Sequence, residues 1–224
     1  MPPIKILKVQ FDAQISAQEL PAFRGAIIAT VGQENDWFSN HLEGESLAYR
    51  YPKIQYKRAR QNPLLVCPEE GVDEMHKFFA VSEPVFRLKG REVAMPVKTL
   101  LLKKLDMRVH PEPQAYQIYH WLGLNTENYQ QYQQLKYQTE QLLFLEKKLV
   151  SNIISFAKGI RWHIEDHFEV KITRLHRQSW MRYKDQRFMA FDLDFETQVF
   201  LPKDIGLGRK VSVGFGVVRP IRTK

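Results

Sequence analysis

The order of strand and helix patterns in the first 94 residues constrains the fold more than any other feature of this chain. The patterns are, in order, a strand at 4–11, a helix opened by a possible capping box at Ser16 and Glu19, strands at 51–58 and 64–67, a helix at 69–80 and a strand at 84–93. A Ser-x-x-Glu sequence before an apolar stripe is typical of a helix start. The order β-α-β-β-α-β is the signature of a ferredoxin-like domain.

A long helical pattern dominates the second half of the chain. Apolar residues recur along it every three or four positions: Leu142, Leu145, Leu149, Ile153 and Phe156. An unbroken helix over 127–158 would be roughly 48 Å long, too long for a small domain, so we expect a break at 137–141. Strand patterns lie at 116–121, 167–177, 187–200 and 211–219. We therefore predict an α+β protein of two tandem ferredoxin-like (RRM-like, βαββαβ) domains, residues 1–94 and 95–224, the second one elaborated.

The chain carries an excess of positive charge. Its 224 residues include 33 Lys and Arg against 25 Asp and Glu, a formal net charge of +8. Nucleic acid, a membrane surface or an acidic partner would each suit that charge. The N-terminus lacks the apolar core of a signal peptide, and no apolar run approaches the ~20 residues of a membrane span, so we expect a cytosolic protein. The single cysteine, Cys67, lies in an apolar run and is expected to pack as a small hydrophobic residue.

Four glycines and two cations gather near the C-terminal end, at residues 206–216. Glycine lets a ligand approach the backbone, and successive N–H groups in such a loop can form an anion-binding concavity. The spacing differs from the P-loop and Rossmann patterns, and no helical pattern follows it. We expect this segment to bind a phosphate-bearing polymer through Gly206, Gly208, Arg209, Lys210, Ser212, Gly214 and Gly216.

Basic residues form two further clusters. One alternates along the predicted strand at 84–93 and comprises Arg87, Lys89 and Arg91. Three cations at period two share one sheet face, which suits a phosphate backbone. The other cluster lies near the tip of the first predicted hairpin and comprises Lys53, Lys57 and Arg58. The alternative for both clusters is the solvated face of a strand.

A histidine in the polar loop after the first helix, His41, is the candidate catalytic residue. Three tyrosines and several cations follow it within sixteen residues, including Tyr49, Arg50, Tyr51 and Lys53. Metal-free RNA cleavage needs one group to activate the 2′-hydroxyl, one to protonate the leaving oxygen and a charge to stabilise the phosphorane. A His, a Tyr and a Lys or Arg can divide these tasks. The alternative is a surface histidine beside a strand that merely alternates Tyr and Lys.

Two patterns that resemble metal sites have simpler explanations. His163 and His167 have the i,i+4 spacing of zinc ligands, but they follow the helix stop at Gly159 and no third ligand is evident. Three acidic residues alternate with three apolar ones on one predicted strand: Phe191, Asp192, Leu193, Asp194, Phe195 and Glu196. That alternation is typical of the wet face of a half-buried strand. We expect no metal and no cofactor.

Four stretches together resemble the CRISPR-associated endoribonucleases that cut repeat RNA into guide RNAs, a family within the repeat-associated mysterious protein superfamily. They are 23–26, whose Arg24 we expect to bind RNA, then 51–57, 142–159, and 200–216. The last is specific, because a C-terminal glycine-rich loop with a basic residue inside is that family's signature. The likeness spans nearly the whole chain and is greatest to the branch found with type I-B systems.

The resemblance implies two ferredoxin-like domains that bind the repeat along a basic surface and cut it without metal, leaving a 2′,3′-cyclic phosphate and a 5′-hydroxyl. It implies a catalytic role for His41, assisted by Tyr49 or Tyr51. We further expect Lys53 or Arg50 to stabilise the phosphate, and the segment 206–216 to help fix the RNA and hold the two domains together. Other effector subunits and a second copy of the chain are further candidate partners. The chain departs from the family at Ser39–Asn40, where relatives often carry a further histidine, and near Val213, where they often carry a basic residue.

Two other functions stay open at this point. A repeat-binding protein that does not cleave would keep the basic faces with an incomplete catalytic set, and the departure at Ser39–Asn40 agrees with that. The other is a general RNA- or DNA-binding protein with no CRISPR link.

Overall fold

The structure, a computed structural model, describes residues 3–40, 51–80 and 85–221. The chain divides into unit 1, which comprises Met1–Asp106 and Ser212–Gly214, and unit 2, which comprises Met107–Val211 and Phe215–Lys224. Each unit contains one four-stranded sheet. Within the described residues, no helix is long and apolar enough to cross a membrane.

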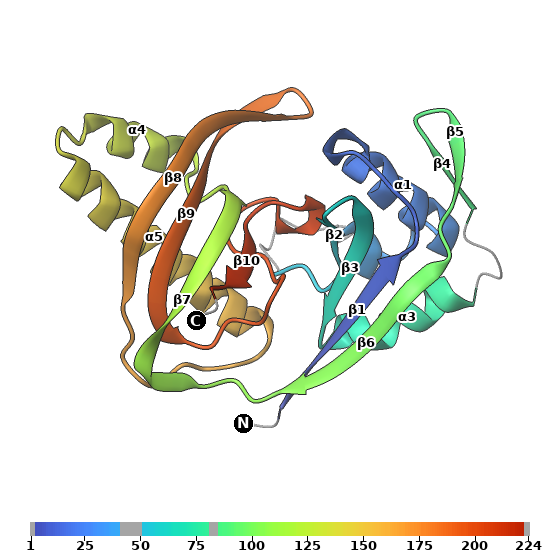
Figure 1. The fold of residues 1–224 in the computed structure, drawn as a ribbon, viewed down its shortest axis with the longest axis horizontal. Coiled ribbons are helices and arrows are strands. Elements are labelled where there is room, and N and C mark those ends of the chain that lie inside the picture. Colours follow the sequence, from blue (N-terminus) through green and yellow to red (C-terminus); the bar gives the residue numbers. More distant parts are fainter. Residues whose placement is uncertain (1–2, 41–50, 81–84, 222–224) are drawn as a thin grey trace. The chain divides into compact units, whose positions relative to one another are not determined.

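Unit 1 is built on an antiparallel sheet with the strand order of a ferredoxin-like domain. Its strands are β1 (Ile4–Phe11), β2 (Gln55–Ala59), β3 (Asn62–Pro68) and β6 (Val97–Leu105). They lie side by side in the order β2-β3-β1-β6. The helices are η1 (Ala17–Glu19), α1 (Leu20–Val31), α2 (Asp36–Ser39) and α3 (Glu70–Phe79). The two longer helices, α1 and α3, pack on the sheet and close one hydrophobic core (Figure 1). The predicted capping box at Ser16 and Glu19 is confirmed at the start of η1.

The fourth strand of this sheet is not the predicted one. Residues 84–93 were expected as a single strand, but β4 (Val85–Leu88) and β5 (Arg91–Ala94) form a two-stranded hairpin, and β6 takes the place beside β1. The reason is the two-residue turn Lys89–Gly90, in which both residues have positive φ, 48° and 87°. A pair of positive φ values is the geometry of a type I′ hairpin turn. The expected domain boundary, between 94 and 95, therefore falls ahead of a strand that pairs within unit 1.

Aromatic side chains from several elements form the centre of the unit 1 core. Phe11 of β1 meets Phe23 of α1 and Phe78 of α3 edge to face, with ring centroids 5.7 and 5.8 Å apart. Phe23 meets Tyr56 of β2 in the same way at 6.0 Å. Such pairs contribute about 0.5–1.5 kcal/mol each beyond the area they bury. The core therefore fixes β2, the strand that follows the candidate catalytic loop in the sequence.

Unit 2 repeats the ferredoxin-like strand order. Its strands are β7 (Val109–Trp121), β8 (Val170–Tyr183), β9 (Gln186–Val199) and β10 (Val217–Pro220), and its helices are α4 (Thr126–Gln134) and α5 (Gln138–Gly159). The short η2 (Val211–Val213) begins at the last residue of the first segment of unit 2, and its other two residues belong to unit 1. The strands lie in the order β10-β7-β9-β8, and all the pairs are antiparallel. The prediction of two ferredoxin-like domains is confirmed. Between β9 and β10, where a standard domain has its second helix, the chain carries the glycine-rich segment, whose residues Ser212–Gly214 belong to unit 1.

The helical pattern of the second half is confirmed in detail. The helix breaks between α4 and α5, close to the expected 137–141, and the apolar stripe from Leu145 to Phe156 is buried on α5. The strand expected at 211–219 is much shorter, because only 217–220 pair with β7. Positive φ values at Lys210, Gly214 and Gly216 break the extended conformation before that point.

Candidate functional site

Three of the predicted catalytic residues, His41, Tyr49 and Arg50, lie outside the described residues. The structure does describe the two points between which their segment runs. The segment follows α2 at Asn40, which has a left-handed backbone with φ of 53°, and it ends before Tyr51, which is buried. Both ends belong to unit 1.

A cluster of contacts holds the end of α2 immediately before His41. The Arg24 guanidinium of α1 donates to the backbone carbonyl of Ser39, and it lies 5.9 Å from the centre of the Tyr56 ring. The Tyr56 hydroxyl donates to the carbonyl of Phe38 at 3.1 Å. Burial raises the pKa of Tyr56, so its hydroxyl stays protonated as a donor. Arg24, predicted to bind RNA, thus has a positioning contact beside the candidate catalytic loop.

Lys53 is held inside unit 1. Its side chain is almost fully buried, and its ammonium pairs with the carboxylate of Glu70 at the start of α3. The backbone at this point is close to α3, since a Cβ on Gly71 would lie 1.9 Å from the carbonyl oxygen of Lys53. A buried cation that already has a carboxylate partner is poorly placed to meet a phosphate. The geometry therefore favours a structural role for Lys53.

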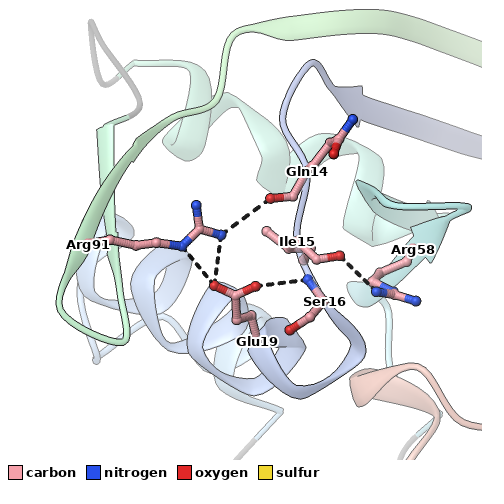
Figure 2. Close-up of polar contacts among 6 residues, drawn as sticks. All are labelled: Gln14, Ile15, Ser16, Glu19, Arg58 and Arg91. Atoms are coloured by element: carbon pink, nitrogen blue, oxygen red, sulfur yellow. Dashed lines mark hydrogen bonds and ion pairs between the residues drawn. The ribbon is translucent and has the colours of Figure 1, made fainter.

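The other two cations of the first hairpin also face inward. Lys57 is only 1% exposed. Arg58 is half-buried and donates through Nη1 to the carbonyl of Ile15 at 2.7 Å (Figure 2). A solvated face, the alternative for this cluster, is wrong for Lys57 because β2 is covered on both of its faces at that point.

The β4–β5 hairpin separates the three cations that were expected on one face. Arg87 pairs in register with Glu92, whereas Arg91 pairs with Leu88. Because directly opposed residues share a face and neighbours along a strand do not, Arg91 lies on the opposite face from Arg87. The expectation of a three-cation face is therefore wrong. Lys89 is exposed in the turn, and the exposed side chain of Arg87 lies 3.5 Å from the Glu92 carboxylate.

Arg91 instead anchors the hairpin to the start of α1. Its guanidinium donates to Glu19 Oε1 at 2.7 and 2.9 Å and to the carbonyl of Gln14 at 3.3 Å (Figure 2). The backbone N–H of Ser16 donates to the other carboxylate oxygen at 2.8 Å. The Ser16 hydrogen bond and the Arg91 guanidinium together lower the pKa of Glu19 to about 2.

Several backbone N–H groups in and next to the glycine-rich segment donate hydrogen bonds to other parts of the protein. The N–H groups of Leu207, Arg209, Gly216 and Val218 donate to carbonyls of the protein at 2.9–3.2 Å. The prediction that successive N–H groups form an anion-binding concavity is wrong at Leu207, Arg209 and Gly216, because their N–H groups donate within the segment, to β7 and to the β7–α4 connection. Lys210 has a left-handed backbone with φ of 56°.

The glycines permit this close packing. A Cβ on Gly216 would lie 1.9 Å from the carbonyl oxygen of Leu207. One on Gly208 would lie 2.8 Å from the Trp121 indole nitrogen, and one on Gly206 would lie 2.3 Å from Val211. In unit 1, Gly214 has φ of 88° and packs against Leu20, next to the half-buried Ser212.

The two cations of the segment lie over aromatic rings of the β8–β9 hairpin. Arg209 donates to the carbonyl of Leu124 at 3.3 Å, and its guanidinium carbon lies 5.5 Å from the Phe188 ring centre. The exposed Lys210 has its ammonium 5.6 Å from the ring centre of Tyr183 and 5.9 Å from that of Phe188. Both cations therefore belong to a surface that also contains aromatic side chains, a combination typical of nucleic-acid binding.

The β8–β9 hairpin was not identified as a candidate functional region from the sequence. Trp180 is 47% exposed, and the guanidinium carbon of Arg187 lies 5.2 Å from its ring centre. The signal was present in the sequence, because residues 177–188 interleave three arginines and a lysine with Trp180, Tyr183 and Phe188. This mixture of basic and aromatic residues was overlooked because both hairpin strands also show the alternation of an ordinary β-strand.

The remaining chemical candidates have structural partners. Asp192 accepts from the backbone N–H of His120 at 2.5 Å, and Asp194 lies 2.7 Å from His176. Burial alone would raise the pKa of Asp192, but the His120 hydrogen bonds and the charge of Arg177 hold it below its ordinary value. The alternation of β9 is confirmed, with its apolar residues buried and its acidic residues half-buried. Within the described ranges, no group of three or more potential metal ligands is present.

Cys67 is fully buried on β3, which confirms its packing role. Burial raises the pKa of its thiol, so the thiol stays protonated and is a poor nucleophile.

This chain is similar in sequence to one known protein and in fold to several solved structures. An uncharacterized protein, MJ0978, from Methanocaldococcus jannaschii is 35% identical over 98 residues, which are 44% of this chain and 65% of that protein. The chain thus matches slightly less than two thirds of that relative's length. A solved structure of Cas6b is 22% identical with a TM-score of 0.88, over 97% of this chain and 99% of the other.

Two further structures share the fold. One, a CRISPR RNA processing endoribonuclease Cas6b, is 21% identical with a TM-score of 0.76, over 97% of this chain and 99% of the other. The other, a Cas6-related protein from Pyrococcus furiosus, is 13% identical with a TM-score of 0.59, over the full length of both chains.

The family models are more decisive, because they match each half separately. The model of the Cas6b N-terminal domain matches residues 2–106, and that of the Cas6b C-terminal domain matches residues 108–221. The junction between the two matches agrees with the end of the first segment of unit 1 at Asp106. This chain belongs to the Cas6b family.

Proposed function

We propose that this protein is an endoribonuclease that binds CRISPR repeat RNA and cleaves the precursor transcript into guide RNAs. The observation that carries the proposal is the match of both Cas6b domain models over nearly the whole chain. A protein of the same fold, with a TM-score of 0.76, is a CRISPR RNA processing endoribonuclease. The net charge of +8 suits an RNA substrate.

The proposed chemistry needs no metal. His41 acts as general acid or base, and Tyr49, with Tyr51 as the alternative, orients or exchanges a proton. The 2′-hydroxyl loses its proton, O2′ attacks the adjacent phosphorus, and the P–O5′ bond breaks as O5′ receives a proton. The products are a 2′,3′-cyclic phosphate and a 5′-hydroxyl. The contacts of Arg24 with Ser39 support this role for the neighbouring segment, because a catalytic loop needs fixed ends.

The burial of each cation decides whether we assign it a structural role or a contact with RNA. Lys53 and Lys57 are buried, so we assign the phosphate contacts to other residues that reach the surface. Those assigned are the exposed Arg87, Lys89 and Lys210 and the half-buried Arg209. Arg50 remains the nearest candidate in sequence for stabilising the phosphorane beside His41. Other effector subunits and a second copy of the chain are further proposed partners, in the cytosol.

Single-turnover cleavage of the cognate repeat RNA tests the proposal. His41→Ala should lower the rate about 10²- to 10⁴-fold while leaving repeat binding nearly intact. His163→Ala, at an exposed histidine in unit 2, is the matched control and should cleave like the wild type. Undiminished cleavage by His41→Ala would remove His41 from the mechanism. Cleavage should also survive excess EDTA, and a loss of activity there would contradict a metal-free reaction.

A second function, repeat binding without cleavage, is favoured by one observation. Relatives often carry a further histidine just before the position of His41, whereas this chain has Ser39–Asn40 there, and Ser39 is buried. The two functions separate when the wild-type protein is incubated with the repeat and with the repeat carrying a 2′-deoxy substitution at the cut site. An endoribonuclease cuts only the first, and a binding protein retains both uncut.

A further inference from the structure

The β8–β9 hairpin extends past the end of β7 and leaves a pocket beside it. The pairing of β7 with β9 stops at Trp121 opposite Phe191, whereas β8 and β9 continue to pair as far as Tyr183 opposite Gln186. A pocket of about 430 Å³ lies between the free part of β9 and the β7–α4 connection. Pockets of roughly 300–1,000 Å³ hold small ligands or single groups of larger ones.

One wall of this pocket is an exposed aromatic platform. Trp180 is 47% exposed, whereas Trp121 and Trp162 are 0% and 8% exposed. Tyr129 of α4 meets the Trp180 ring edge to face at 5.3 Å, and the Arg187 guanidinium carbon lies 5.2 Å from its centre. Unpaired bases stack on aromatic side chains and on arginine guanidinium planes, so this pair of groups presents the surface that such a base recognises.

The rest of the lining suits the polar parts of a nucleotide. Asn125 and Thr126 begin α4 at the pocket wall and supply an amide and a hydroxyl. The Asn125 Oδ1 already accepts from the backbone of Asn128 at 2.7 Å, which directs the amide nitrogen of Asn125 toward other acceptors. Among the described residues of the lining, Arg187 and Arg209 are the charged ones, and none is acidic. Two arginines without a carboxylate complement a phosphate.

We propose that this pocket, the Trp180 pocket, takes one unpaired nucleotide of the bound RNA, with its base stacked on Trp180 and its phosphate on Arg187 and Arg209. The inference deepens the proposed function and rests on it, since it names how an RNA substrate is held. It adds Trp180, Tyr129 and Arg187 to the RNA-binding residues. Stacking is tolerant of base identity, so the pocket selects an unpaired nucleotide over a paired one rather than a sequence.

Binding of the cognate repeat RNA to the full chain tests this. Trp180→Ala should weaken binding about 5- to 100-fold, whereas Trp180→Phe, which keeps a stacking ring, should stay within about 3-fold of the wild type. Tyr137→Ala is the matched control, because Tyr137 is 67% exposed on the same unit and does not line the pocket. At saturating RNA, the single-turnover rate of Trp180→Ala should equal that of the wild type, since the change affects holding and not chemistry.

A scan of abasic substitutions through the repeat identifies the nucleotide. An abasic substitution at one unpaired position should weaken RNA binding to the wild type by the same factor as Trp180→Ala does. The same abasic RNA should bind Trp180→Ala as tightly as the unmodified RNA binds that variant. Titration with a short unpaired oligonucleotide should also quench the indole fluorescence of the wild type and not that of Trp180→Phe. The fluorescence readout and the scan keep the test valid if the alanine variant loses stability.

The outcomes distinguish this inference from the proposed function. Trp180→Ala that binds as tightly as the wild type, in a protein that still cleaves with His41, overturns the pocket and leaves the endoribonuclease intact. A wild type that neither binds nor cleaves repeat RNA overturns both. Adenosine monophosphate that quenches Trp180 at lower concentration than the oligonucleotide would make this a mononucleotide site and overturn the RNA assignment.

Discussion

Two groups of cations that look alike in the sequence have opposite environments. Lys53 and Lys57, before and on β2, are 4% and 1% exposed, and Lys53 pairs with a carboxylate. Arg209 and Lys210 of the glycine-rich segment lie over the aromatic rings of the β8–β9 hairpin, and Lys210 is exposed. A basic residue near a suspected RNA-binding motif is therefore not evidence for a phosphate contact until its burial is known. The first group is buried within unit 1, and the second lies beside the aromatic rings of the β8–β9 hairpin.

The sharpest test of this contrast concerns the backbone that presents Arg209 and Lys210. Gly216→Ala should destabilise the protein by about 3 kcal/mol or more, because the new Cβ would overlap the carbonyl oxygen of Leu207 at a position with φ of 64°. Thermal and urea unfolding measure it. Gly25→Ala is the control, since nothing lies within 4 Å of a Cβ there, and in the middle of α1 it should stabilise by about 0.5–1 kcal/mol. Equal stability of the two variants would show that the segment can relax.

Removal of the buried ammonium should have the next largest effect. Lys53→Met should lower the free energy of unfolding by about 2 kcal/mol, because it leaves the partly buried Glu70 carboxylate without its partner. Lys89→Met, in the exposed turn of the β4–β5 hairpin, should leave stability unchanged. Urea unfolding of both variants is the measurement. If Lys53→Met instead kept full stability and lost RNA affinity, the division between the two groups of cations would be wrong.

Substitution of the exposed Lys210 should affect RNA binding and leave stability unchanged, and the effect should be smaller than that of Lys53→Met. Lys210→Ala should weaken RNA binding about 3- to 10-fold and reduce the salt dependence of binding by about one phosphate contact, with no change in the unfolding midpoint. Binding isotherms between 50 and 200 mM salt measure both quantities. An unchanged salt slope would mean that Lys210 contacts its aromatic neighbours and not phosphate.

Glu19 and Arg91 give the smallest and most specific effect, which depends on pH. The pKa of Glu19 is lowered from 4.5 to about 2 in the folded protein, so its ionised form stabilises the fold above pH 4.5. That contribution is lost as the pH falls from about 4.5 to about 2. The midpoint of thermal unfolding of Glu19→Gln should therefore lie below that of the wild type at pH 7 and converge with it near pH 2. A constant difference across this range would show that the carboxylate is not the titrating group.

Much of the fold could be predicted because it follows hydrophobic periodicity. The order of elements in unit 1 and the buried stripe of α5 are examples. The β4–β5 hairpin could not, because the cations at 87, 89 and 91 imitate one strand while Lys89–Gly90 forms a turn. The first residues of β7 were missed for another reason. Pro111 and Pro113 argue against a strand, and the structure accommodates them with a shift in register between Val109 and Gln114.

The candidate site was predictable only in part. The basic residues of the glycine-rich segment could be identified from the sequence. Its backbone hydrogen bonds could not, because their acceptors at Leu122 and His120 lie about 90 residues earlier in the chain. The Trp180 pocket depends on where β7 ends relative to β9, a matter of register that no local pattern encodes. The assignments of His41, Tyr49 and Arg50 stay predictions.

The hydrogen bonds inside the glycine-rich segment have a consequence for redesign. Because the N–H groups of Leu207 and Gly216 are satisfied within the protein, the loop needs no hydrogen bond from RNA at these two positions to hold its shape. The side chains at 209 and 210 can then be substituted while these backbone hydrogen bonds remain. A library confined to those two positions should alter substrate preference without refolding the loop.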